Sequence, residues 1–187
     1  MDFRNLTSYR EKKLNVVDVN ERTYFTDSSF NPNLIIGMAF GANYDEKSHN
    51  YKLAKAVIDS REYFGKEIPV LVQSEIGECL MRSGEKNFYF VGENYAEGES
   101  SLIKSKIDTE GIFKHCKKII KSKGLGNKIL YVAHPAHMQR VLDTAKKQGL
   151  EGIPFVSEKV EWLDDAQPWV TSPYLWVPRE IVARVLK

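Results

Sequence analysis

Between residues 34 and 156 the sequence alternates short β-rich runs with segments of helical periodicity, and this alternation restricts the possible folds more than any other feature. The first run, 33–41, is almost continuously apolar, which is typical of a strand buried on both faces of a parallel sheet. The next segment, 48–64, carries apolar residues three and four positions apart and is followed by Gly65, as expected for a helix. We therefore predict an α/β fold, a three-layer sandwich around a mainly parallel sheet of about five strands.

The other elements follow in the same order. Further strands are predicted over 68–72, 87–91, 128–133 and 153–156. Further helices are predicted over 76–81, from Asp108 to Gly124, over 135–149, and from Pro178 onward, because proline suits the first position of a helix. Residues 14–19 are compatible with an edge strand, but the pattern of segment 1–33 does not decide its structure.

Length and composition are those of one ordinary soluble domain spanning residues 1–187. A chain of this size buries roughly 70% of its unfolded surface, so it needs no metal or disulfide to fold. The net charge of +2 gives no reason to expect a nucleic acid partner. Residues 1–13 contain no apolar run of signal-peptide or transmembrane length, so we expect a cytoplasmic protein without a membrane partner.

Ligands of open parallel sheets bind beyond the carboxyl ends of the strands. This rule selects polar or glycine positions that follow the predicted strands or begin the helices after them. Taken singly, each of them is more simply a solvated loop residue. Among the selected residues are Gly41, Asn43, Ser74, Glu75, His134 and His137.

The strongest candidate site is the start of the helix after the fourth predicted strand. Pro135 suits the first helical position, which makes His134 the N-cap and places His137 and Arg140 on the same side of the helix. Free N–H groups, two imidazoles and a guanidinium would attract a phosphate or carboxylate. A structural alternative stays open, in which His134 only caps the helix, His137 satisfies a core hydrogen bond and Arg140 pairs with a carboxylate. We expect no metal, because two histidines three positions apart still need a third ligand.

Two other functions stay open as alternatives. Cys79 lies early in a predicted helix, where the helix dipole can lower a thiol pKa, so a hydrolase or transferase using Cys79, or the pair His134 and His137, is one of them. A buried core residue is the usual role of such a cysteine. The other alternative is a protein-interaction module that uses the tail around Trp162, Trp169 and Trp176. Such a module could form a homo-oligomer.

The segment 128–140 resembles the strand, short loop and His-Met-x-Arg helix start of the YdcF-like domain family, a Rossmann-like α/β group whose biochemical role is largely unsettled. Asp108 and Thr109 resemble the family's Asn-Thr pair, and 34–41 resembles its first glycine-ended strand. The resemblance implies a pocket at His137 and Arg140. The chain departs from the family pattern at 73–75, 111–112 and 133–134, so part of that polar pocket is missing or rebuilt.

Our leading hypothesis is a domain that binds a small anionic or nucleotide-like ligand at the carboxyl edge of the sheet. Arg140 would hold the negative charge, and His137 would form a hydrogen bond or move a proton. Thr109, Glu75 and Asn43 are placed to complete the wall. S-adenosylmethionine is the first ligand to test, on the analogy of folds with this topology. The sequence does not decide whether the protein is an enzyme.

Overall fold

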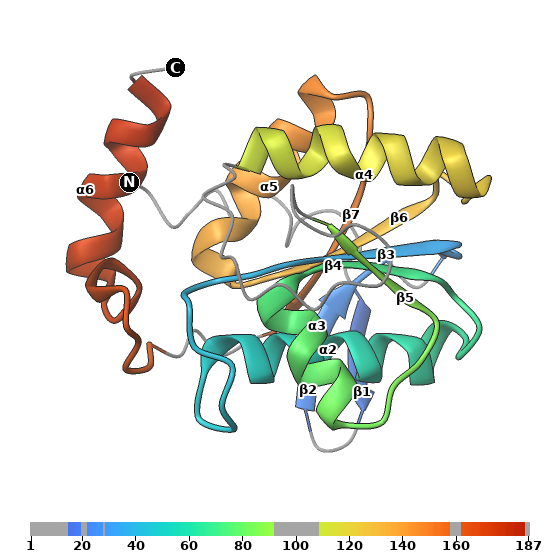
Figure 1. The fold of residues 1–187 in the computed structure, drawn as a ribbon, viewed down its shortest axis with the longest axis horizontal. Coiled ribbons are helices and arrows are strands. Elements are labelled where there is room, and N and C mark those ends of the chain that lie inside the picture. Colours follow the sequence, from blue (N-terminus) through green and yellow to red (C-terminus); the bar gives the residue numbers. More distant parts are fainter. Residues whose placement is uncertain (1–14, 20–21, 28, 92–108, 158–161, 186–187) are drawn as a thin grey trace.

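The computed structural model describes residues 15–19, 22–27, 29–91, 109–157 and 162–185. The described strands form a seven-stranded sheet in the order β1-β2-β7-β6-β3-β4-β5, with helices on both faces (Figure 1). Asp108, and with it the N-terminal boundary predicted for its helix, lies outside the described residues.

The predicted parallel sheet is confirmed. Its strands pair in parallel throughout, and the central strand β3 lies between β4 and β6, with Ile36 opposite both Leu71 and Tyr131. Every residue of β3 and β6 is buried, which explains why both read as continuous apolar runs. The parallel strands are β3 (Leu34–Met38), β4 (Val70–Gln73), β5 (Phe88–Val91), β6 (Ile129–Ala133) and β7 (Gly152–Ser157).

An antiparallel hairpin extends the sheet beyond β7. It consists of β1 (Asn15–Val19), which falls in the segment that was compatible with an edge strand, and β2 (Arg22–Thr26), which the sequence did not predict. The hydroxyl of Tyr24 in β2 donates to the buried carboxylate of Asp59, 2.5 Å away, on the helix that follows β3. The hairpin is thereby tied to the parallel part of the fold.

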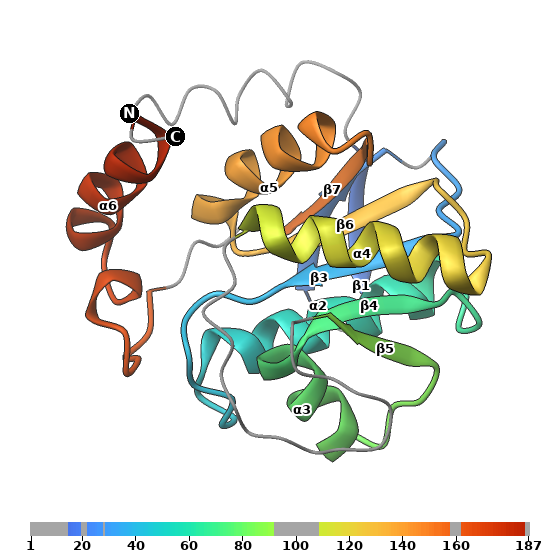
Figure 2. The ribbon, with the colours of Figure 1, turned by 45° about the horizontal axis from the view of Figure 1, so that its top comes forward.

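Four helices cover the two faces of the sheet (Figures 1 and 2). On one face, α2 (His49–Phe64) and α3 (Ser74–Arg82) bury apolar residues such as Val57 and Ile76 against the sheet. On the other face, α4 (Thr109–Lys123) and α5 (Pro135–Lys147) do the same with Phe113 and Val141. The three-layer arrangement predicted from the sequence is therefore present.

The C-terminal segment, which we define as residues 162–185, contains the short 3-10 helix η1 (Pro168–Val170) and the helix α6 (Pro173–Val185). The prediction that Pro178 begins this helix is wrong. Ser172 sets the start, since its carbonyl accepts from the Trp176 N–H at 3.1 Å, and Pro173 takes the first position. Pro178 lies inside α6, and because proline has no N–H, it donates no helical hydrogen bond to the carbonyl of Tyr174, four residues earlier. Figures 1 and 2 show α6 at one end of the molecule, outside the layers that flank the sheet.

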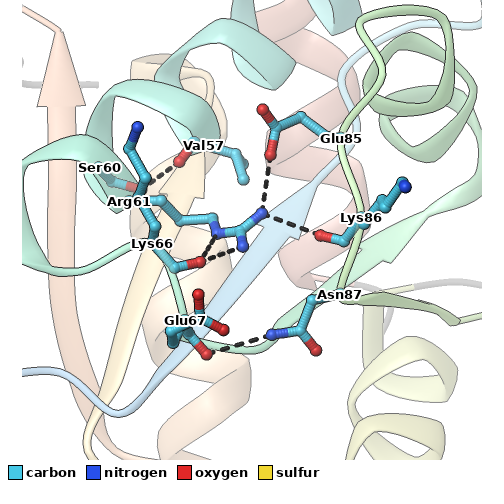
Figure 3. Close-up of polar contacts among 8 residues, drawn as sticks. All are labelled: Val57, Ser60, Arg61, Lys66, Glu67, Glu85, Lys86 and Asn87. Atoms are coloured by element: carbon cyan, nitrogen blue, oxygen red, sulfur yellow. Dashed lines mark hydrogen bonds and ion pairs between the residues drawn. The ribbon is translucent and has the colours of Figure 1, made fainter.

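At the amino end of the sheet, Arg61 joins two loops (Figure 3). Its Nε donates to the carbonyl of Lys66 at 2.8 Å, and Nη2 contacts the same oxygen. Its Nη1 pairs with the Glu85 carboxylate at 2.8 Å and donates to the Lys86 carbonyl at 3.0 Å. The guanidinium therefore holds the turn after α2 against the turn after α3.

We expect the Arg61→Lys variant to lose about 2 kcal/mol of unfolding free energy, because an ammonium lacks the planar fork that reaches all of these acceptors. Urea denaturation measures this change. The matched control is Arg82→Lys at an exposed position of α3, for which we expect a change within about 0.5 kcal/mol. Equal losses in the two variants would contradict the role given to Arg61.

Candidate functional site

The turn after β3 is held in shape by side chains from neighbouring elements. Asn50, fully buried in the first turn of α2, accepts from the Phe40 N–H at 2.9 Å. Its amide nitrogen donates to the carbonyls of Gly41 at 3.3 Å and Asn43 at 2.8 Å. Gln73, at the end of β4, accepts from the Ala39 N–H at 2.8 Å. The carbonyls of residues 41 and 43 are thus turned toward Asn50.

The N–H groups of this turn hold a carboxylate. Asp165, from the C-terminal segment, accepts from Ala42 N at 2.9 Å and from Asn43 N at 3.1 Å. Gly41 has a φ of +89°, and a Cβ built on it would lie 2.3 Å from Asp165 Oδ2. The absence of a side chain at position 41 therefore makes room for the carboxylate. We call residues 41–43 the anion turn, since successive backbone N–H groups of this kind form anion-binding concavities.

The start of α5, where the sequence predicted free N–H groups, has none to offer in its first turn. His134 is the N-cap, as predicted, and its Nδ1 accepts from Ala136 N at 3.2 Å. The carbonyl of His134 accepts from the N–H groups of His137 at 2.8 Å and Met138 at 3.0 Å. Pro135 has no N–H. The expectation of open donors is wrong here, because the cap residue satisfies them itself.

Aromatic side chains fill the space next to this helix start. The ring of His134 stacks on Phe40 with a centroid distance of 4.0 Å. Trp162 lies 5.1 Å from His134, and Trp176 lies 5.8 Å from His137, both measured between ring centroids. The Trp176 indole N–H also donates to the Ala136 carbonyl at 3.2 Å. Both predicted catalytic histidines are consequently buried, with exposed fractions of 5% and 4%.

The charge of Arg140 is engaged within the chain. Its Nη1 lies 2.8 Å from Oε2 of Glu180, whose side chain is fully buried, and its guanidinium lies over the Trp176 ring. Burial lowers the pKa of His134 to about 3, so this imidazole is neutral at pH 7 and adds no positive charge. The geometry agrees with the structural alternative for His134 and Arg140, in which one caps the helix and the other pairs with a carboxylate.

His49 is a residue of this region that the sequence reasoning missed. It is buried in the first turn of α2, and its Nε2 accepts from the Leu163 N–H at 3.0 Å. Burial lowers its pKa, although the nearby Asp165 carboxylate raises it in part. In the neutral ring the proton is then on Nδ1, for which no acceptor lies within hydrogen-bonding distance among the residues that the structure describes.

The remaining predicted site residues lie at the ends of neighbouring strands. Ser74 and Glu75 begin α3 directly after β4, and the Ser74 hydroxyl donates to the Glu75 carboxylate at 3.1 Å. Thr109 begins α4, on the opposite face of the sheet from α2 and α3. The structure thus brings Gly41 and Asn43 together around one carboxylate and places His134, His137 and Arg140 in the packed corner beside them.

Cys79 lacks the environment of a nucleophile. It is fully buried, and its Sγ lies 3.3 Å from the carbonyl oxygens of Tyr44 and Glu75, either of which can accept its single S–H proton. Burial raises its pKa to about 11, which keeps the thiol protonated at pH 7. The position in the core accounts for this cysteine, so the geometry gives no support to a thiol-dependent reaction.

Comparison with known proteins gives no further guide. No family model, no curated protein and no solved structure matches this chain.

In the described part of the chain, no group of three or more His, Cys, Asp or Glu side chains is arranged so that it could hold a metal ion. None of the described helices combines the length and the apolar character that crossing a membrane requires.

The low pKa of His134 predicts an acid-dependent loss of stability. The imidazole has a pKa of about 3 in the folded chain and an ordinary value of 6.5, so unfolding takes up a proton between these limits. The unfolded state binds more protons there, so the free energy of unfolding falls as the pH drops below 6.5, by up to about 1.4 kcal/mol per pH unit. His134→Asn keeps a capping side chain but removes the titrating group, and we expect a shallower pH dependence in urea denaturation between pH 4.5 and 7. Parallel curves for the two proteins would contradict this assignment.

The burial of both cysteines predicts that the folded protein resists alkylation. We expect no labelling of Cys79 or Cys116 by iodoacetamide at pH 7 within an hour, and labelling of both after unfolding in urea. Mass spectrometry of peptides measures the labelling at each site. Fast labelling of Cys79 in the native protein would show that its thiol is accessible and would reopen a nucleophilic role.

Proposed function

We propose that this protein binds a small anionic, nucleotide-like ligand at the carboxyl edge of the sheet, with the anionic group on the anion turn. One observation carries the proposal: the N–H groups of Ala42 and Asn43 already hold a carboxylate against Gly41. Backbone N–H groups that bind one carboxylate can also bind the carboxylate or phosphate of a ligand.

The position of the anion turn in the sheet supports the proposal. The chain passes from β3 through α2 to β4 on one side, while β6 pairs with β3 on the other side. The strand order therefore reverses between β3 and β6, and ligands of open α/β sheets bind at such a switch point. The anion turn follows β3, and His134 follows β6, so both flank this point.

The end of β4 supports the nucleotide-like character. In dinucleotide-binding sheets of this topology, an acidic side chain after the second strand binds the ribose hydroxyl groups. Glu75, in the first turn of α3 directly after β4, would have this role in the proposed site. S-adenosylmethionine and adenine nucleotides each combine a ribose with an anionic group, so they are the ligands to test first. We also propose that the protein is related to the YdcF-like domain family and that it is located in the cytoplasm.

In this proposal the residues at the start of α5 have a supporting role. Arg140, His137 and His134 contact the C-terminal segment through Glu180, Trp176 and Trp162, and the ligand's charge lies on the anion turn instead. Binding is the function that we propose.

The test compares ADP, S-adenosylmethionine and uncharged adenosine by thermal unfolding. We expect ADP or S-adenosylmethionine to stabilise the wild type, by about 2.7 kcal/mol at a concentration of 100 times Kd, and adenosine to stabilise it less. Gly41→Ala should abolish the effect, because the added Cβ takes the space of the anion.

The matched control is Gly84→Ala. Gly84 also has a positive φ, +76°, but a Cβ there meets nothing within 4 Å, so this variant carries the backbone strain without blocking the turn. We expect it to bind like the wild type. Equal binding by the two alanine variants, or equal stabilisation by adenosine and the charged ligands, would refute the proposal.

A further inference from the structure

We infer that the C-terminal segment regulates this site as an internal competitor, in which the Asp165 carboxylate occupies the position of a ligand phosphate and must leave before the phosphate binds. The inference rests on the proposed function and adds to it the ligand class and the control of access.

The contacts of Asp165 are those of a bound anion. Its two oxygens accept from the backbone N–H groups of Ala42, Asn43 and Gln167, at 2.9, 3.1 and 2.8 Å. Two of these donors belong to the anion turn, whose shape is set by Asn50 from α2. Since that support comes from α2, the turn stays ready for another anion when Asp165 leaves.

The rest of the C-terminal segment covers the same edge. Leu163 donates to His49, Trp162 lies against His134, and Trp176 lies 4.7 Å from Phe40 between ring centroids. The cover therefore extends from the end of β3 to the start of α5. A ligand bound at the anion turn, with its ribose lying along the carboxyl edge of the sheet, would collide with Trp162 and Trp176. The C-terminal segment must therefore move before such a ligand can bind.

The attachment of the segment suits displacement. α6 lies outside the layers that flank the sheet (Figures 1 and 2), and Tyr174, Leu175, Ile181 and Val182 on it are exposed. The buried side chains of the segment are Val170, Trp176 and Glu180, and two of them, Val170 and Trp176, belong to the core cluster on the α2 and α3 face. Release of the segment removes Val170 and Trp176 from that cluster, while α2, α3, α4 and α5 keep their own contacts with the sheet.

The competition selects the ligand class. A carboxylate on the same chain acts at a high effective concentration, so a free monocarboxylate makes no gain by replacing it. A phosphate monoester or diphosphate carries more charge and more acceptor oxygens, and the nucleoside adds further contacts. We therefore assign the site to phosphate-bearing ligands, with ADP as the probe.

The test compares Asp165→Ala with Asp164→Ala. Both changes remove one negative charge from adjacent positions, but Asp164 is exposed and only Asp165 contacts the anion turn. We expect Asp165→Ala to bind ADP at least tenfold more tightly than the wild type in calorimetry and Asp164→Ala to bind like the wild type. ADP should also shift the tryptophan fluorescence of the wild type to the red, as Trp162 and Trp176 leave the edge.

The outcomes separate the two proposals. If Asp165→Ala and Asp164→Ala bind ADP equally, the competition is refuted and the anion site stands. If neither the wild type nor either variant binds ADP or inorganic phosphate, the proposed function fails. Should Asp165→Ala not fold, Asp165→Asn keeps the shape without the charge and should show the same gain. Failure of both variants to fold would make Asp165 a structural residue and overturn the inference.

Discussion

A single carboxylate on backbone N–H groups organises the carboxyl edge of this protein. Asp165 and the anion turn are more than 120 residues apart in the chain, and their hydrogen bonds fix where the C-terminal segment crosses the sheet. In the same stretch of chain, Leu163 donates to His49 and Trp162 lies against His134. The attraction between the Asp165 carboxylate and oriented peptide dipoles thus acts together with the aromatic packing to hold this stretch against the sheet.

The polar residues at the start of α5 illustrate how burial changes the meaning of a motif. An imidazole in water is a candidate acid or base, but His134, stacked on Phe40 with its Nδ1 on a backbone N–H, is a neutral cap. Glu180 is fully buried and Arg140 is partly buried, so desolvation offsets much of the attraction in their ion pair. The pair connects α6 to α5. The positive charge of Arg140, which we expected to bind a ligand, therefore holds the C-terminal segment instead.

The accuracy of the sequence predictions follows the range of the interactions involved. Strands such as β3 and the capping role of His134 beside Pro135 depend on local patterns, and both were predicted correctly. Gly41 and Asn43 were selected because they follow a strand. Their partner Asp165 was not predicted, since no local pattern marks a contact between residues more than 120 positions apart. The hairpin strand β2 and the start of α6 at Pro173 were missed for a related reason: the structure of a five-residue strand and of a tail with several prolines depends on the surface on which they pack.

In the proposed competition, the stability of the C-terminal segment is linked to ligand affinity. When binding requires an open state, the apparent dissociation constant equals the intrinsic one divided by the open fraction. The hydrogen bonds of Asp165, the packing of Trp176 and the pair of Arg140 with Glu180 all stabilise the closed state, so each of them lowers the open fraction. The proposal therefore implies that residues that never touch the ligand partly set the affinity for a phosphate ligand. On this view Arg140 influences binding in the direction opposite to that of a ligand-binding arginine, because its loss opens the site.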